Sequence, residues 1–228
     1  MHRPHRITIH QHKEFLEGGR VRFVHNVADA PLVDIHVVAL DNKSEKATFL
    51  GLGYSQNTGY MNVKAGERSF MVTLSGTSTA VSKIRFPVEN GRSYTCIIHG
   101  LVAMNNVDTF PVEDATLCTA VGKAAVRFIH ASAGSPNVDI LGPGRVTLFS
   151  NIGYGMDGGY LNAPAGKIAL DVAVTGPKQT IVLSLAPLNL EAGKAYTVIA
   201  RGIVGNEKTP LAVTILNDQN EFCSITGM

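Results

Sequence analysis

The chain has no tryptophan, only three cysteines among its 228 residues, and few charged side chains. Charged residues make up 17%, below the roughly 25% usual for soluble domains. Because 20 basic residues nearly balance 18 acidic ones, the net charge is only +2. This balance gives no electrostatic reason to expect nucleic acid or an anionic membrane surface as a partner.

Other absences narrow the class further. No stretch reaches the ~20 consecutive apolar residues of a membrane-spanning helix, so we expect no membrane insertion. The basic N-terminus has no apolar signal core, so the sequence predicts no cleaved leader and leaves the location open. Cys96 lies in an apolar run and is predicted to be a buried free thiol. Whether Cys118 and Cys223 form a bridge is not determined by their spacing.

The common catalytic and cofactor motifs are also missing. The chain has no Gly-x-Ser-x-Gly elbow, phosphate-binding loop, dinucleotide fingerprint or His-Glu-x-x-His. Its acidic residues are scattered, so no pair of carboxylates can be proposed for glycoside chemistry. The sequence therefore predicts no enzyme, no cofactor and no catalytic residue.

An internal repeat organises what is present. Residues 21–35 align with 126–140, residues 53–66 with 153–166, and residues 90–102 with 192–204. Nine of 15, seven of 14 and six of 13 positions are identical in these blocks, at offsets of 105, 100 and 102. The nearly constant offset indicates two copies of one unit that differ in loop length.

Each copy is predicted to be all β. Segments such as VRFVH and SFMVTL alternate their side chains and are rich in β-branched and aromatic residues, and Gly, Pro, Asn and Asp interrupt them every 8–12 residues. Many short strands at this spacing favour two tandem immunoglobulin-like antiparallel β-sandwiches, with seven strands each. The expected divisions are an N-terminal arm at 1–19, repeats at 20–111 and 123–216, a linker at 112–122 and a C-terminal tail at 217–228.

The string VRFIHASAGSPNVDI, followed by GYGMDGGYLNAPAG and LEAGKAYTVIARGIV, resembles the tandem repeats called domain of unknown function 4397. The resemblance covers both copies, and the second copy is the nearer match. It implies an immunoglobulin-like β-sandwich and a surface or extracellular location. It implies no established enzymatic activity and supplies no catalytic residue.

Two sets of repeated residues have alternative interpretations. His25 and His130, with Asp34 and Asp139, could form metal or acid–base sites, but we favour side-chain hydrogen bonds that fix turns, so no metal site is predicted. Tyrosines beside repeated glycines could bind a glycan or small ligand, or could be core tyrosines that bond to loop backbone. The candidate ligand-binding set is Tyr54, Tyr60, Tyr154 and Tyr160.

The N-terminus carries a further pattern. Residues 6–10 alternate polar and apolar side chains, so Ile7 and Ile9 would point the same way in a strand. We expect this arm to pair as an edge strand and to contribute to self-association. The sequence thus predicts a non-catalytic structural or adhesive protein that forms a homo-oligomer, filament or surface assembly, with glycan or small-ligand binding as the alternative.

Overall fold

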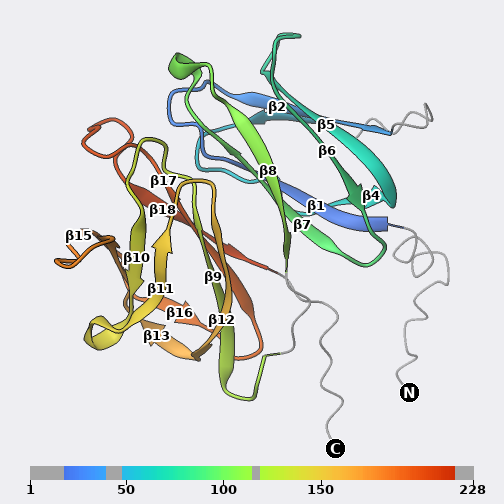
Figure 1. Cartoon of the computed structure of the whole chain (residues 1–228). Coiled ribbons are helices and arrows are strands. Elements are labelled where there is room, and N and C mark those ends of the chain that lie inside the picture. Colours follow the sequence, from blue (N-terminus) through green and yellow to red (C-terminus); the bar gives the residue numbers. More distant parts are fainter. Residues whose placement is uncertain (1–17, 40–47, 115–118, 219–228) are drawn as a thin grey trace, which may run out of the picture. The chain divides into compact units, whose positions relative to one another are not determined.

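The computed structural model describes residues 18–39, 48–114 and 119–218, and these residues are all β apart from two short 3-10 turns, η1 (Val102–Met104) and η2 (Pro143–Arg145). Within this part of the chain no helix is long and apolar enough to cross a membrane. The described residues form two compact units. The first comprises 18–25, 31–97 and 108–114 apart from the gap, and the second comprises 26–30, 98–107 and 119–218. The prediction of an all-β chain with two sandwiches is confirmed (Figure 1).

The first eight strands form two four-stranded sheets, with the orders β4-β1-β7-β8 and β3-β2-β5-β6. Their bounds are β1 (Gly18–His25), β2 (Val33–Ala39), β3 (Thr48–Leu52), β4 (Met61–Lys64), β5 (Gly66–Leu74), β6 (Ala80–Val88), β7 (Ser93–His99) and β8 (Asp108–Asp114). Strand β8 therefore extends beyond residue 111, where the sequence predicted the first repeat to end.

Aromatic rings from both sheets fill the first core. Phe23 of β1 lies 5.4 Å from Phe70 of β5, and Phe70 stacks on Phe86 of β6 at 5.1 Å. Tyr94 of β7 completes the chain of contacts at 5.2 Å from Phe86. Since successive side chains of a strand point to opposite faces, Arg22 projects from the other face of β1. This alternation places the two arginine side chains of β1 away from the aromatic core.

The last ten strands form the second unit, with sheets β12-β9-β17-β18 and β11-β10-β14-β15 and the short pair β13-β16. Their bounds are β9 (Lys123–His130), β10 (Val138–Leu141), β11 (Thr147–Ile152), β12 (Asp157–Pro164), β13 (Gly166–Ile168), β14 (Asp171–Val174), β15 (Ile181–Ser184), β16 (Leu188–Leu190), β17 (Ala195–Arg201) and β18 (Ala212–Asn217). Val126, Phe128, Ile140 and Val198 belong to its buried core.

One hairpin differs between the two units. In the first unit β5 and β6 pair along their whole length, with a single irregularity between Val72 and Thr73. In the second unit the corresponding hairpin is divided into β13-β16 and β14-β15, and the amide of Leu185 donates to the carbonyl of Leu170 between them. Pro187, which has no N–H to donate to a ladder, lies at this break, whereas Pro87 is accommodated within β6 opposite Glu67.

The structure refines the predicted strand arrangement. Among the described residues, the expectation of seven strands in each copy is replaced by eight and ten, and β9 pairs with β17 in parallel within sheets that were expected to be antiparallel. The late strands of the two units are equivalent, because Tyr94 lies in β7 and Tyr196 in β17. Gly100 and Gly202 follow these strands with φ values of +102° and +90°.

Candidate functional site

Each unit contains a cluster of hydrogen-bonded polar side chains, the most extensive polar grouping that the two units share. In the second unit this cluster lies on the outer face of the sheet that contains β9 and β17. We call it the second polar cluster, formed by Arg127, Tyr160, Thr197 and Asp218. The strand register brings these residues together, because Arg127 lies opposite Thr197 in the β9-β17 pair and opposite Tyr160 in the β9-β12 pair. Asp218 directly follows β18, the next strand in the sheet.

The hydrogen bonds of this cluster converge on one hydroxyl and one carboxylate. Nε and Nη2 of Arg127 donate to Oγ1 of Thr197 at 3.0 and 2.9 Å. The hydroxyls of Thr197 and Tyr160 both donate to Oδ2 of Asp218, at 2.6 and 2.8 Å. The Arg127 guanidinium also lies 4.5 Å from the centre of the Tyr160 ring, and its Nη1 is 3.4 Å from Asp157. The hydroxyl of Thr197 thus links a buried cation to a buried anion.

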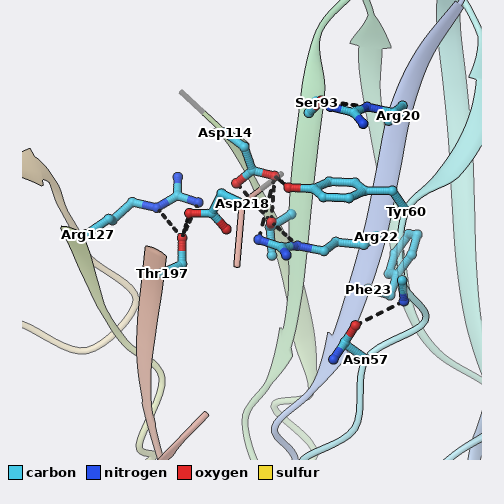
Figure 2. Close-up of polar contacts among 12 residues, drawn as sticks. Arg20, Arg22, Phe23, Asn57, Tyr60, Ser93, Asp114, Arg127, Thr197 and Asp218 are labelled. Carbon is cyan, nitrogen blue, oxygen red and sulfur yellow. Dashed lines mark hydrogen bonds and ion pairs between the residues drawn. The ribbon is translucent and has the colours of Figure 1, made fainter. Parts of the chain in front are cut away.

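The first unit repeats this arrangement in the first polar cluster, formed by Arg22, Tyr60, Thr95 and Asp114. Arg22 Nε donates to Thr95 Oγ1 at 2.8 Å, and Thr95 Oγ1 donates to Asp114 at 2.7 Å. The Tyr60 hydroxyl donates to Asp114 Oδ2 at 2.7 Å, and its ring lies 4.5 Å from the Arg22 guanidinium. Figure 2 shows Tyr60 pointing to Asp114, and Arg127 and Asp218 both reaching Thr197.

A second arginine distinguishes the first unit. Arg20 Nε donates to Ser93 Oγ at 3.1 Å, and the Arg20 guanidinium lies 5.0 Å from the Tyr60 ring centre. The alignment of the two copies places Ala125 and Ala195 at the equivalent positions. The shared chemistry is therefore one arginine, one aspartate and the two hydroxyls between them.

Burial limits what these clusters can do chemically. The arginine, threonine and aspartate of each cluster are at most 3% exposed. An ion pair with hydrogen-bonded hydroxyls in such a place fixes the strands that carry it, because separating any one member leaves a buried charge. Each cluster joins the first strand and the last two strands of its unit to a tyrosine, so its arrangement is one that holds these strands together.

The repeated histidines make the turn contacts that the sequence analysis favoured. Nε2 of His25 lies 3.1 Å from the carbonyl oxygen of Pro31, and Nε2 of His130 lies at the same distance from that of Pro136. The amide of Ser132 donates to Nδ1 of His130, so a neutral ring protonated on Nε2 satisfies both neighbours. Burial lowers the pKa of both histidines, and the hydrogen bonds to the proline carbonyls oppose this only in part.

The repeated aspartates fix loops beside these turns. Asp34 accepts from the amides of Gly51 and Gly76 at 2.8 and 3.1 Å. Asp139 accepts from the Asn151 amide and the Thr175 hydroxyl, both at 2.8 Å. Burial by itself would raise the pKa of each carboxyl, but the hydrogen bonds to its charged form outweigh burial, so the pKa of each is lowered.

The structure separates the four predicted tyrosines into two kinds. Tyr60 and Tyr160 belong to the polar clusters described above. Tyr54 and Tyr154 instead contact the edges of the His25 and His130 rings, with centroids 6.4 and 6.3 Å apart. Ligand binding by the four tyrosines stays a prediction.

The hydroxyl-to-backbone bond considered for those four is made by Tyr94 and Tyr196. The amides of Glu89 and Glu191, each five residues upstream, donate to these hydroxyls at 3.3 and 3.1 Å. This is the pattern of the tyrosine corner of sandwiches.

The remaining candidates are a thiol, metal sites and the arm. Cys96 is fully buried, and burial raises the pKa of its thiol well above the ordinary value. Among the described residues, no three His, Cys, Asp or Glu side chains are grouped so that they could hold a metal. Ile7, Ile9, Cys118 and Cys223 lie outside the described residues.

Sequence reasoning missed the polar clusters, although part of the signal was available. The arginines, tyrosines and threonines fall in the three aligned blocks and are identical in both copies. Asp114 and Asp218 lie outside the blocks, in segments interpreted as linker and tail. Their offset of 104 fits the repeat, so extending the alignment past its last block would have found them.

A family model described as Domain of unknown function (DUF4397) matches residues 19–141, which cover the first copy and the start of the second. No curated protein matches the chain.

Similar solved structures are distant. The Bacillus anthracis TIE protein matches at 12% identity and a TM-score of 0.29 over 82% of this chain, and the chain spans about a third (34%) of that protein's length. A family CBM26 module of Eubacterium rectale Amy13K, solved with maltoheptaose, matches at 8% identity and a TM-score of 0.30, covering 89% of this chain and 98% of the module. A putative cell adhesion protein of Bacteroides eggerthii matches at 9% identity and a TM-score of 0.23, covering 89% of this chain and 96% of that one.

Proposed function

This chain belongs to the DUF4397 family, and on that premise we propose that it is a non-catalytic structural or adhesive protein built from two tandem repeats of that family. It acts through protein–protein contacts and self-association as a component of a surface or other assembly. The second repeat is assigned to the family from its alignment with the first, at 22 of 42 positions in the three blocks.

One observation carries the proposal: the polar side chains that the two repeats share make their hydrogen bonds within each repeat and so stabilise the fold. Arg22, Thr95 and Asp114 bond to one another, as do their counterparts in the second unit. The shared histidines and aspartates bond to turns and loops. A catalytic or ligand site common to both repeats would need some of these groups to face a substrate. Their use inside each repeat favours a scaffold whose exposed edges and loops make the contacts.

The proposal is tested by the mass of the protein in solution. Light scattering coupled to size-exclusion chromatography should give a mass above the 24.3 kDa of one chain, rising with concentration. Deleting residues 1–12 should lower that mass, because the arm is proposed to contribute to association. A full chain that stays monomeric at every concentration, and that forms no filaments in electron micrographs, would contradict the proposal.

The alternative of glycan or small-ligand binding has one observation in its favour. Tyr154 is 37% exposed although its ring contacts the buried His130, so an aromatic surface remains open to solvent. A glycan array probed with the full chain, and with Tyr154→Ala as the matched variant, separates the two functions. Specific binding that the variant loses would favour the ligand-binding function.

A further inference from the structure

The two units differ along the side where β15 and β18 lie. In the first unit the equivalent edge strands, β6 and β8, are in contact. The hydroxyl of Ser82 on β6 donates to that of Thr109 on β8 at 2.9 Å, and both side chains are buried. In the second unit β11 contacts β12 on one side of the sandwich, so β15 and β18 border the other side. Strand pairing and the repeat offset place Leu183 and Val213 at the positions of Ser82 and Thr109, so that hydroxyl bond is lost.

Exposed apolar residues line this side of the second unit, which we call the open side. On β15, Ile181 is 38% and Val182 37% exposed, while Leu183 packs against the core. On β18, Ile215 is 45% exposed although it lies opposite the core residue Val198 in the β17-β18 register, which places it on the inner face of its sheet. Part of the sandwich interior therefore faces solvent at the open side.

The edge strands of the two units also differ in the number of charged residues they carry. In the first unit β6 carries Lys83 and Arg85, and β8 carries Asp108, Glu113 and Asp114. In the second unit neither β15 nor β18 contains a charged residue. Sheet edges are usually protected from pairing by charged side chains, prolines or bulges. The open side lacks the charges of its counterpart, as expected for an edge that receives another strand.

We propose that residues 6–10 of a second copy add to the open side as a strand beside β15, an inference that rests on the proposed self-association. The arm's alternating pattern puts Ile7 and Ile9 on one side of an extended segment, where they can cover Ile215 while the backbone pairs with β15. The seven residues 11–17 that link this segment to β1 can span at most about 25 Å, so the two copies must lie close together. Neither β15 nor β18 carries a basic residue that would repel Arg6 and His10.

A peptide-binding experiment tests the two halves of this contact separately. The receiver is the full chain with Ile7→Asp and Ile9→Asp, which cannot dock its own arm, and the probe is a fluorescent peptide of residues 1–12. We expect saturable binding, and adding Ile181→Asp should weaken it about tenfold or more. The matched control is Ala80→Asp, because Ala80 is exposed at the equivalent position of β6 and should leave binding unchanged. Val182→Lys is a second edge variant, and far-UV circular dichroism checks that each variant is folded.

Light scattering of the same variants separates the inference from the proposed function. Loss of self-association in the Ile7/Ile9 and Ile181 variants, with Ala80→Asp unaffected, would support both. If Ile181→Asp dissociates the assembly while the Ile7/Ile9 variant stays assembled, the arm is not the occupant, and only the inference fails. If the full chain is monomeric yet the peptide binds through Ile181, the arm docks within its own chain and the second copy is excluded. If the chain is monomeric and the peptide does not bind, both are wrong.

Discussion

Replacing Thr197 by valine should destabilise the second unit more than any other substitution that keeps the size and shape of the side chain. Valine matches threonine in volume and β-branching, so the strand propensity and packing of β17 are retained. The variant loses a hydroxyl that accepts from two nitrogens of Arg127 and donates to Asp218. Both partners remain buried, at 1% and 2% exposure. The perturbation therefore isolates the hydrogen bonds of the second polar cluster.

The magnitude follows from the charged partners. A hydrogen bond to a charged group contributes about 1.5–3 kcal/mol, and a buried group left unsatisfied costs its desolvation. Arg127 keeps its contacts with Asp157 and the Tyr160 ring, and Asp218 keeps the Tyr160 hydroxyl, which limits the loss. We expect about 2–4 kcal/mol, a fall in the melting temperature of this unit of roughly 10–20 °C.

Differential scanning calorimetry is the assay, because it can separate the transitions of the two units. The matched control is Thr214→Val on β18, where the hydroxyl accepts from the partly exposed Arg201 at 3.0 Å. That variant should cost less than about 1 kcal/mol. Equal losses for Thr197→Val and Thr214→Val would refute the view that the polar cluster ties the strands together.

Three further predictions concern other buried groups. Asn26 is 2% exposed, and within the described structure neither polar atom of its side chain has a hydrogen-bond partner. Replacing it by alanine, the residue at the equivalent position 131, should therefore raise the urea midpoint and add about 1–3 kcal/mol to the free energy of unfolding. An unchanged or lower midpoint would contradict this. Because burial lowers the folded-state pKa of His25 and His130, the unfolded chain binds more protons near its ordinary histidine pKa of about 6.5, so unfolding free energy should fall as the pH drops below that value. His130→Ala should lower stability at pH 7.5 by about 1–3 kcal/mol and weaken the pH dependence, and an unaltered pH profile in urea titrations would count against the assignment. The Cys96 thiol, buried and with a raised pKa, should resist alkylation until the first unit unfolds, as peptide-level mass spectrometry can show; rapid labelling of the native protein would show the assignment to be wrong.

The sequence predicted which segments form strands better than it predicted which strands pair with each other. Alternation in VRFVH identified β1, and the alignment of the two copies carried this assignment to β9. The parallel pairing of β9 with β17 could not be predicted. The alternation within a strand indicates which side chains share a face, but it does not identify the neighbouring strand. The division of the second hairpin could not be predicted from Pro187, because Pro87 lies within the continuous strand β6.

The candidate site was harder to predict for a related reason. Arg127 and Thr197 stand in an alternating strand pattern, where a polar residue is normally interpreted as solvent-facing. Both are buried, and their contacts with Tyr160 and Asp218 form only in the folded sheet. The turn role of His25 was predictable because its partner Pro31 lies only six residues away, within reach of local turn chemistry. The partners of Asp34, Gly51 and Gly76, lie 17 and 42 residues away, so only the folded structure identifies them.

The pairing of the first long strand with the last but one has a consequence for how the second unit folds. Arg127 and Thr197 are 70 residues apart in the chain, yet they lie opposite each other in a parallel ladder. Contacts of such high sequence separation slow folding, since the loop between them must be closed before the pairing stabilises anything. During synthesis β9 can pair first with β12, but its parallel partner β17 emerges later, and Asp218 is made later still. Until β17 has emerged, one edge of the central strand β9 is unpaired, and pairing with the wrong repeat competes with correct folding.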